Sequence, residues 1–205
     1  MATIYDLKPQ FQALLRPMAA ALAKRGISAN EVTLGALVLS AAQGAWLALM
    51  PGSAWPLLVL PVTLLLRMAF NAIDGLMAKE HGQATPAGAV LNEISDVAAD
   101  AALYLPFALI AGVNAPLVVL VVVAGIVAEM TGALGPMLAG PRNYGGPLGK
   151  SDRAFAFGLL AVLIGVGLTP GLWSTLYLAA LLVLSALTVL NRARTIVAHA
   201  KGKAA

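Results

Sequence analysis

The chain has no cysteine, only two histidines and few charged residues, and each shortage excludes a class of protein. Without cysteine there are no disulfides or thiolate metal sites, and two histidines disfavour a multi-histidine metal site. Only 11% of the 205 residues are charged, against about 25% in soluble domains. Hydrophobic residues make up 60% and the mean hydropathy is +0.87, so the chain would expose too much apolar surface in water. We therefore expect an integral membrane protein.

Long apolar segments occupy most of the sequence, and most of them reach the ~20 residues that a membrane-spanning helix needs. They cover residues 30–50, 55–79, 86–111, 115–139, 152–169 and 171–190. Turn residues separate several of them, and no repeat or domain linker interrupts them. The sequence predicts an all-α integral membrane protein with a single domain over residues 1–205. Its six transmembrane helices would fall within residues 28–195, followed by a cytoplasmic tail over 196–205.

Residues 1–27 lack the long apolar run of a signal peptide but show apolar residues at helical spacing. Lys8, Gln12 and Arg16 fall on the opposite side. This pattern predicts an amphipathic helix in the membrane interface, with Pro17 as a place to bend. A surface helix packed on the loops fits the same pattern. The apolar residues are Ile4, Leu7, Phe11, Leu14, Leu15, Met18 and Leu22.

The basic residues predict how the chain is oriented in the membrane. Lysines and arginines precede the first span, close the second, separate the fourth from the fifth and follow the sixth, whereas the other three loops contain none. With six spans, all basic segments fall on one side, which the positive-inside rule makes cytoplasmic. Both termini are therefore expected in the cytoplasm. The net charge of +4 is explained by orientation, so we expect no nucleic-acid partner.

Polar side chains inside spans are costly and are therefore candidates for function. In the second span Arg67, Asn71 and Asp74 follow one another at i, i+4 and i+7, which is one helix face. A short loop joins the second and third spans, so we expect antiparallel neighbours whose polar faces meet. Such carboxylates must be protonated or bind a cation, and oxygen ligands favour Mg, Mn or Ca. The polar residues of the third and fourth spans are Asn92, Glu93, Asp96, Asp100 and Glu129.

The spacing of these residues resembles the signature of the CDP-alcohol phosphotransferase family, D-x2-D-G-x2-A-R-x8-G-x3-D-x3-D. Asn71 and Asn92 stand in place of aspartates and Lys79 in place of arginine, as in a divergent bacterial branch. The segment 28–33 is similar to the family's T-P-N-x-x-T before the first span, and Gly149-Lys150 to its G-K before the fifth. The matching motif positions are Asn71, Asp74, Gly75, Ala78, Lys79, Gly88, Asn92 and Asp96.

The resemblance implies a transferase of substituted phosphate groups in phospholipid biosynthesis. It would move a phosphoalcohol group, here a phosphatidyl group, from a CDP-alcohol such as CDP-diacylglycerol to a small alcohol or polyol and release CMP. Asp96 would be the catalytic base, and one or two Mg or Mn ions would be bound. A homodimer in the bacterial inner membrane is also implied. The metal-ligand candidates are Asp74, Asn71, Asn92, Asp96 and Asp100, and the substrate-binding candidates are Gly75, Ala78, Lys79, Gly88, Asn30, Thr33, Arg67, Arg142, Lys150 and Arg153.

The two asparagines leave several alternatives open, because an amide brings no charge to a metal. The site could hold a single ion, use Glu93 or Asp100 as a replacement ligand, or belong to a catalytically silent subunit that binds a CDP-lipid. A cation transporter is a further alternative, although its acids would lie nearer the membrane middle. Arg67 either neutralises buried acids or binds phosphate. Arg142, Lys150 and Arg153 either contact ligand or only set the orientation.

Overall fold

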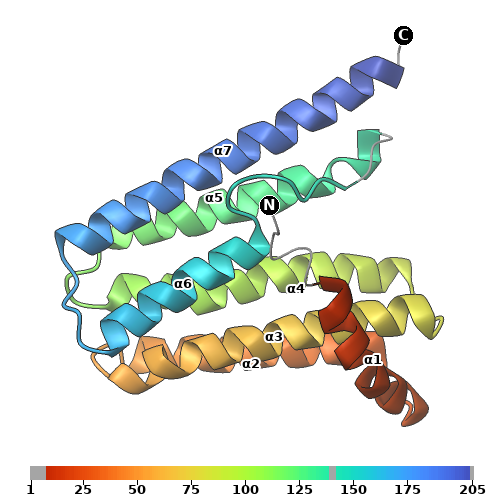
Figure 1. Cartoon of the computed structure of the whole chain (residues 1–205), viewed down its shortest axis with the longest axis horizontal. Helices are drawn as coiled ribbons and strands as arrows, with labels where there is room; N and C mark the ends of the chain where they lie inside the picture. The colour runs from red at the N-terminus through yellow and green to blue at the C-terminus, as the bar shows by residue number, and fades with distance from the viewer. Residues whose placement is uncertain (1–7, 139–141, 204–205) are drawn as a thin grey trace. The chain divides into compact units, whose positions relative to one another are not determined.

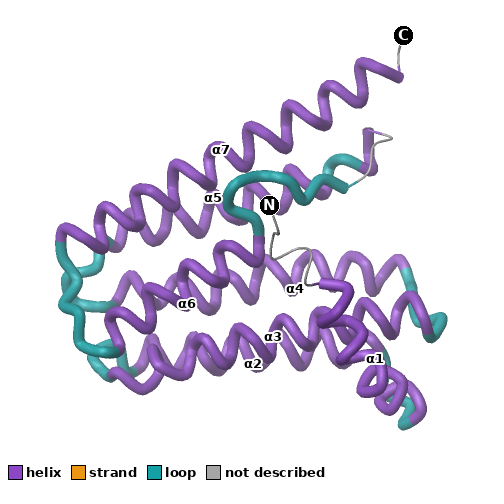
Figure 2. The backbone as a smooth tube through the Cα atoms, viewed as in Figure 1, coloured by secondary structure: helices purple, strands orange, loops and turns teal. Residues whose placement is uncertain are grey.

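The computed structural model describes residues 8–138 and 142–203, and within these ranges every regular element is a helix (Figures 1 and 2). The predicted all-α class is confirmed for this part of the chain. Ile4 and Leu7 of the predicted interfacial helix lie outside the described residues. The α-helices are α1 (Lys8–Lys24), α2 (Ala29–Leu49), α3 (Ala54–Glu80), α4 (Pro86–Tyr104), α5 (Ala115–Ala133), α6 (Lys150–Gly165) and α7 (Leu172–Lys203), and two short 3-10 helices cover Leu105–Leu109 and Pro136–Leu138.

Four of these helices are long and apolar enough to cross a membrane: α2, α3, α5 and, over Leu172–Lys201, α7. Two of the six predicted spans do not meet this criterion. Helix α4 carries three carboxylates, those of Glu93, Asp96 and Asp100, and α6 has only 16 residues. The number of six spans is thus not confirmed by length and composition.

Two helices end at other residues than the predicted spans do. The spans were predicted from hydropathy, whereas the helix ends depend on the conformational preferences of the backbone. Helix α4 stops at Tyr104 and a 3-10 helix with Pro106 follows, because proline inside an α-helix removes a hydrogen bond and clashes with the preceding turn. Helix α7 continues to Lys203, well past the predicted end at residue 190 and through most of the predicted tail. Its 32 residues extend over about 48 Å, longer than a hydrocarbon core of about 30 Å.

The start of α2 is fixed by a pair of reciprocal hydrogen bonds. The Ser28 hydroxyl accepts from the Glu31 N–H at 3.2 Å, and the Glu31 carboxylate accepts from the Ser28 N–H at 2.7 Å. This capping box satisfies two N–H groups at the helix start. Gly26 lies in the turn after α1 and has a φ of +79°, a backbone conformation that a residue with a side chain rarely adopts.

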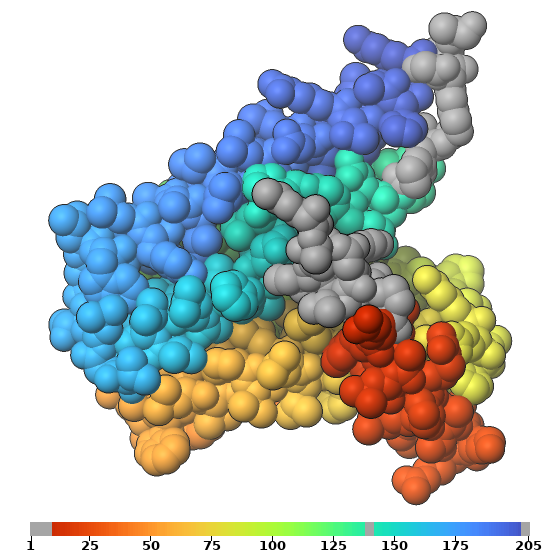
Figure 3. Space-filling view, in the orientation of Figure 1, coloured from red at the N-terminus to blue at the C-terminus, as the bar shows by residue number. Residues whose placement is uncertain are grey.

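The chain groups into two compact units, Met1–Trp46 with Val59–Leu103, and Leu47–Leu58 with Tyr104–Ala205. In the first unit, one side of α1 packs on α2 and α3. The other side exposes Leu14 (76%) and Met18 (54%), and Arg16 pairs with Glu80 at the end of α3. Figure 3 shows α1, in red, at the surface. Helix α1 therefore has an unburied apolar face, as an interfacial helix requires. Its buried contacts form a cluster of Leu15, Ala19, Ala29, Val32, Ile73, Leu76 and Met77.

Helices α2 and α4 approach each other closely at Gly44. A Cβ atom built on Gly44 would fall on the backbone carbonyl of Ala102, so this crossing has no room for any side chain. In a membrane, apolar burial does not drive helix association. Close packing of the helices drives it instead, and small residues permit that packing. Gly44 therefore fixes how α4, which carries Glu93, Asp96 and Asp100, lies against α2.

The second unit is built around α5 and α7, which lie side by side over much of their length (Figure 1). Tyr104 stacks on Phe157 of α6 with ring centroids 4.1 Å apart, and Phe107 meets the same ring edge-on at 5.3 Å. All three aromatic side chains are buried. They tie the 3-10 segment after α4 to α6.

Candidate functional site

The predicted contact between the polar faces of α3 and α4 is present. Arg67 of α3 forms an ion pair with Asp100 of α4 at 2.5 Å and donates to the backbone oxygen of Asp96 at 2.9 Å. Its guanidinium lies 3.7 Å from the Asp96 carboxylate. Arg67 is 3% exposed and Asp100 6%, so the pair is removed from solvent. A buried charge is costly without an opposite charge beside it, and Arg67 and Asp100 are such partners for each other.

One helical turn along α3, the side-chain amide of Asn71 donates a hydrogen bond to Asp96 Oδ1 at 3.0 Å. Asn71 and Asp96 come from the two halves of the spaced motif. This contact brings the halves together within the first unit and orients the carboxylate of the predicted catalytic base.

Asp74 has a different neighbour, although it shares a helix face with Asn71. Its carboxylate accepts a hydrogen bond from Thr33 of α2 at 2.7 Å, and the Thr33 hydroxyl also contacts the Ala29 carbonyl at 3.1 Å. Both side chains are buried. The polar stripe of α3 therefore serves two helices: Arg67 and Asn71 contact α4, and Asp74 contacts α2. Thr33, predicted to bind substrate, holds a metal-ligand candidate.

The small residues of the motif differ in how much space surrounds them. A Cβ on Gly75 would meet nothing within 4 Å, so there is open space beside Asp74. A Cβ on Gly88 would lie 2.7 Å from Asn30 Oδ1 and 3.0 Å from Thr85 Oγ1. Gly88 thus allows Asn30, at the start of α2, to approach the start of α4. Ala78 is partly buried and Lys79 is exposed at the end of α3.

Gln83 was not identified as a site residue from the sequence, yet it joins two loops beside the motif. Its carbonyl oxygen accepts from the Ala29 N–H at 2.6 Å and its amide donates to the Ile27 carbonyl at 3.3 Å. These bonds hold the α1–α2 turn, and with it Asn30, against the α3–α4 loop. A single glutamine in a polar loop gives no periodic signal from which its partners can be inferred.

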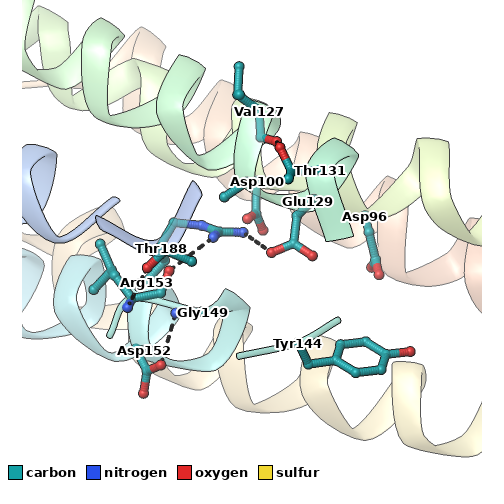
Figure 4. Close-up of polar contacts among 12 residues, drawn as sticks. Asp96, Asp100, Val127, Glu129, Thr131, Tyr144, Gly149, Asp152, Arg153 and Thr188 are labelled. Atoms are coloured by element: carbon teal, nitrogen blue, oxygen red, sulfur yellow. Dashed lines mark hydrogen bonds and ion pairs between the residues drawn. The ribbon is translucent and has the colours of Figure 1, made fainter. Parts of the chain in front are cut away.

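In the second unit, Glu129 of α5 lies near three arginines. Figure 4 shows its contact with one of them, Arg153. Its carboxylate is 3.0 Å from Arg153, 3.4 Å from Arg192 and 3.6 Å from Arg142. Glu129 is itself buried, so it is a buried partner for these arginines. Arg142 and Arg153, predicted to bind substrate, thus have a carboxylate partner in their own unit. Lys150 is the first residue of α6, whose start is capped by Asp152 accepting from the Gly149 N–H at 3.0 Å.

Arg192 was missed from the sequence because it falls beyond the predicted end of the sixth span. Its guanidinium donates to the backbone oxygens of Ala128, Gly145 and Tyr144. The Thr188 hydroxyl, one turn earlier, accepts from the Leu148 N–H at 2.9 Å. The spacing of Ser185, Thr188 and Arg192 puts them on one helix face, and this stripe was a usable signal for a buried arginine. The hydrogen bonds of Thr188 and Arg192 hold the segment before α6 against α7.

The donor set was compared with what a divalent cation needs. Within residues 8–138 and 142–203, no group of three or more histidine, cysteine, aspartate or glutamate side chains is suitable to hold a metal ion. Asp74, Asp96 and the amide oxygens of Asn71 and Asn92 are oxygen donors of the type that Mg and Mn prefer, with two negative charges among them. Asp100, one of the two candidates for a replacement ligand beside Glu93, is paired with Arg67. Asp74 and Asp96 are thus the only charged donors among these four residues.

The chain shares its fold with a phosphatidylinositol phosphate synthase of Mycobacterium tuberculosis. The crystal structure of that protein with CDP-DAG bound has a TM-score of 0.75 and 22% sequence identity, over 90% of this chain and 94% of that one. The structure in complex with manganese and citrate has a TM-score of 0.73 and 24% identity, over 89% and 88% of the two chains.

The family is shown by a closer relative. The chain is 43% identical over 196 residues to the inner membrane protein YnbA of Escherichia coli (strain K12), across 95% of this chain and 96% of that protein. It therefore belongs to the same family as that protein. No protein-family model matches the chain.

Proposed function

We propose that the chain is a membrane transferase that moves a phosphatidyl or related phosphoalcohol group from a CDP-alcohol to a hydroxyl acceptor and releases CMP. The observation that carries this proposal is the Asn71–Asp96 hydrogen bond, which unites the two halves of the motif. The fold adds support, because a protein of the same fold was crystallised with CDP-DAG bound. CDP-diacylglycerol is accordingly the proposed donor, and a small alcohol or polyol the acceptor.

In the proposed reaction, Asp96 accepts the proton of the acceptor hydroxyl as its oxygen attacks the β-phosphorus of the CDP-alcohol. The new P–O bond forms to the acceptor, the bond to the CMP phosphate oxygen breaks, and CMP leaves with the electron pair. Asn71 orients the Asp96 carboxylate, since its amide donates to Oδ1. A positioned carboxylate of this kind contributes about 10²–10⁴-fold to rate.

Binding of the diphosphate is proposed for the residues around the end of α3 and the start of α4. Gly75 leaves space beside Asp74, and Gly88 permits the approach of Asn30. Lys79, exposed at the end of α3, would contact the diphosphate as a point charge without the two-point grip of arginine. Ala78 would line the same place. Thr33 contributes indirectly by donating to Asp74.

A bound divalent cation would neutralise the charge of the transferring phosphate. The residues proposed to hold it are Asp74, Asn71, Asn92 and Asp96. The protein of the same fold that was crystallised with manganese supports a metal of this class.

The other basic residues that were predicted to bind substrate have different roles in the proposal. Arg67 pairs with Asp100, which favours neutralisation of the acids over phosphate binding. Arg142 and Arg153 share Glu129, so a ligand anion would compete with that carboxylate. Lys150, at the first position of α6, is proposed to contact ligand phosphate.

The proposed setting is the bacterial inner membrane, because the relative YnbA is named an inner membrane protein. Six spans, α2 to α7, are proposed with both termini in the cytoplasm and α1 in the interface. Helix α4 can be one of them because Asp96 and Asp100, two of its three acids, contact polar groups of α3. A homodimer and a single membrane domain remain predictions from the resemblance and the sequence.

The purified protein, incubated with CDP-diacylglycerol, Mg or Mn and a panel of alcohols, should release CMP and form a new phospholipid. One observation favours a second candidate, a silent CDP-lipid-binding subunit: two motif aspartates are asparagines. Binding of CDP-diacylglycerol without CMP release under every acceptor would favour that candidate. Cation uptake into vesicles without nucleotide chemistry would favour a transporter and contradict the proposal.

A further inference from the structure

Arg67 is an unusual side chain to find in the middle of an apolar helix. It is four residues before Asn71 in α3, follows three leucines, and is 3% exposed. A charged side chain at such a position is costly, so it is expected to be retained only where a partner compensates it. Its ion pair with Asp100 and its contacts with Asp96 are that compensation.

The charges around Arg67 limit how many cations the cluster can take. Asp96 and Asp100 contribute two negative charges beside the one positive charge of Arg67, which leaves a net charge of −1 on these three side chains. Asp74, on the same face of α3 and in contact with Thr33, adds one further negative charge. One divalent cation balances the sum of these charges. A second would place excess positive charge among buried groups, where Coulomb repulsion is strong.

The position of the guanidinium adds a geometric argument. Arg67 donates both to the Asp100 carboxylate and to the backbone oxygen of Asp96, so the two acids of α4 are held from the same side. Asn71 donates to Asp96 Oδ1 through its amide nitrogen, which leaves the Asn71 oxygen as the group that can serve a metal. Asp100 is thus paired with Arg67, and the proposed donors for a cation are Asp74, Asn71, Asn92 and Asp96.

We infer that Arg67 is a built-in counter-cation that replaces one of the two divalent ions implied by the motif, so that the site binds at most one. This inference rests on the proposed function only in assigning the cation to the site described above. It assigns Arg67 a role as a positioning residue for Asp96 and Asp100, and it resolves the alternatives for the two asparagines in favour of a single ion.

The test is to count Mn²⁺ ions on the full chain in lipid nanodiscs by electron paramagnetic resonance, which needs no turnover. Wild type is expected to bind at most one ion. Arg67→Met removes the positive charge and should add a second ion or tighten Mn²⁺ binding by at least about tenfold. Arg67→Lys keeps the charge and should bind as wild type does. Arg67→Met with Asp100→Asn keeps the net charge of the cluster and should also remain at one ion.

Two ions on the wild-type chain would overturn the inference, and this measurement does not depend on any variant folding. Unchanged Mn²⁺ binding in a folded Arg67→Met variant would overturn it as well. Failure of the proposed function is seen separately, as absence of CMP release from a protein that still binds a single Mn²⁺. Two ions on a chain that does release CMP would refute the role of Arg67 as a counter-cation and leave the proposed function unaffected.

Discussion

The side-chain amide of Asn71 lies 3.0 Å from Asp96 Oδ1 and donates a hydrogen bond to it, joining α3 to α4 inside an apolar bundle. The motif that the sequence resembles has an aspartate at position 71, where this chain has an amide that donates to Asp96. The change removes a repulsion between like charges and replaces it with a hydrogen bond to a charged group, worth about 1.5–3 kcal/mol.

Replacing Thr33 by valine should weaken the contact between α2 and α3. Asp74 is buried and accepts from the Thr33 hydroxyl at 2.7 Å. Loss of that donor should cost about 1.5–3 kcal/mol of stability and reduce Mn²⁺ affinity. Thermal unfolding in detergent and Mn²⁺ titration measure the two effects. Thr33→Ser keeps the hydroxyl and should restore both, and equal losses in the serine variant would contradict the role given to this bond.

A methyl group at Gly44 should destabilise the bundle. It would fall on the carbonyl of Ala102, whereas a methyl at Gly35 in the same helix would meet only the Phe70 ring at 4.0 Å. Gly44→Ala is expected to cost about 1–3 kcal/mol through helix displacement, and Gly35→Ala very little. The unfolding temperatures of the two variants decide the matter, and equal temperatures would show that α2 and α4 are not so closely packed.

Gly75→Ala should separate folding from ligand binding. The added methyl meets no protein atom within 4 Å, so the unfolding temperature should stay unchanged. If the lipid diphosphate occupies that space, affinity for CDP-diacylglycerol should fall about tenfold, or ~1.4 kcal/mol. Isothermal titration with the lipid in micelles measures it. Gly52→Ala, which also meets nothing within 4 Å, is the control. Unchanged affinity in Gly75→Ala would place the ligand elsewhere.

Glu129→Gln should be far more damaging than removal of an exposed acid. The substitution leaves Arg153 and Arg192, both about 2% exposed, without their shared carboxylate. Breaking a buried ion pair from one side costs about 3–5 kcal/mol. Glu80→Gln removes the exposed partner of Arg16 and should change the unfolding temperature little. Similar unfolding temperatures for the two variants would mean that Glu129 is solvated.

Part of the site was predictable from periodicity alone. The polar face of Arg67, Asn71 and Asp74, and its contact with α4, follow from the helical repeat and a short loop. What spacing did not reveal is that Asp74 faces Thr33 on α2, because a helix face about 60° wide can serve two neighbours. Whether Arg67 binds phosphate or acids was also open, and only the position of its guanidinium against Asp100 favours the acids.

The ends of helices were the least predictable feature. Hydropathy indicates where a helix leaves the bilayer and not where it ends, so α7 was expected to stop near residue 190, although its backbone continues to Lys203. Arg192 was missed for that reason. The bonds that Gln83 makes to Ala29 and Ile27 depend on how two loops meet, which no local pattern encodes.

The most direct test of the account compares CMP release by wild type and Asp96→Asn, with CDP-diacylglycerol, Mn²⁺ and the best acceptor of the alcohol panel. Gly52→Ala, between α2 and α3, where an added methyl meets nothing within 4 Å, is the control. The account predicts that Asp96→Asn lowers the rate by about 100-fold or more while CDP-diacylglycerol still binds, because the proton acceptor is lost and the residues proposed to bind the diphosphate remain. CMP release by Asp96→Asn at the wild-type rate would contradict it.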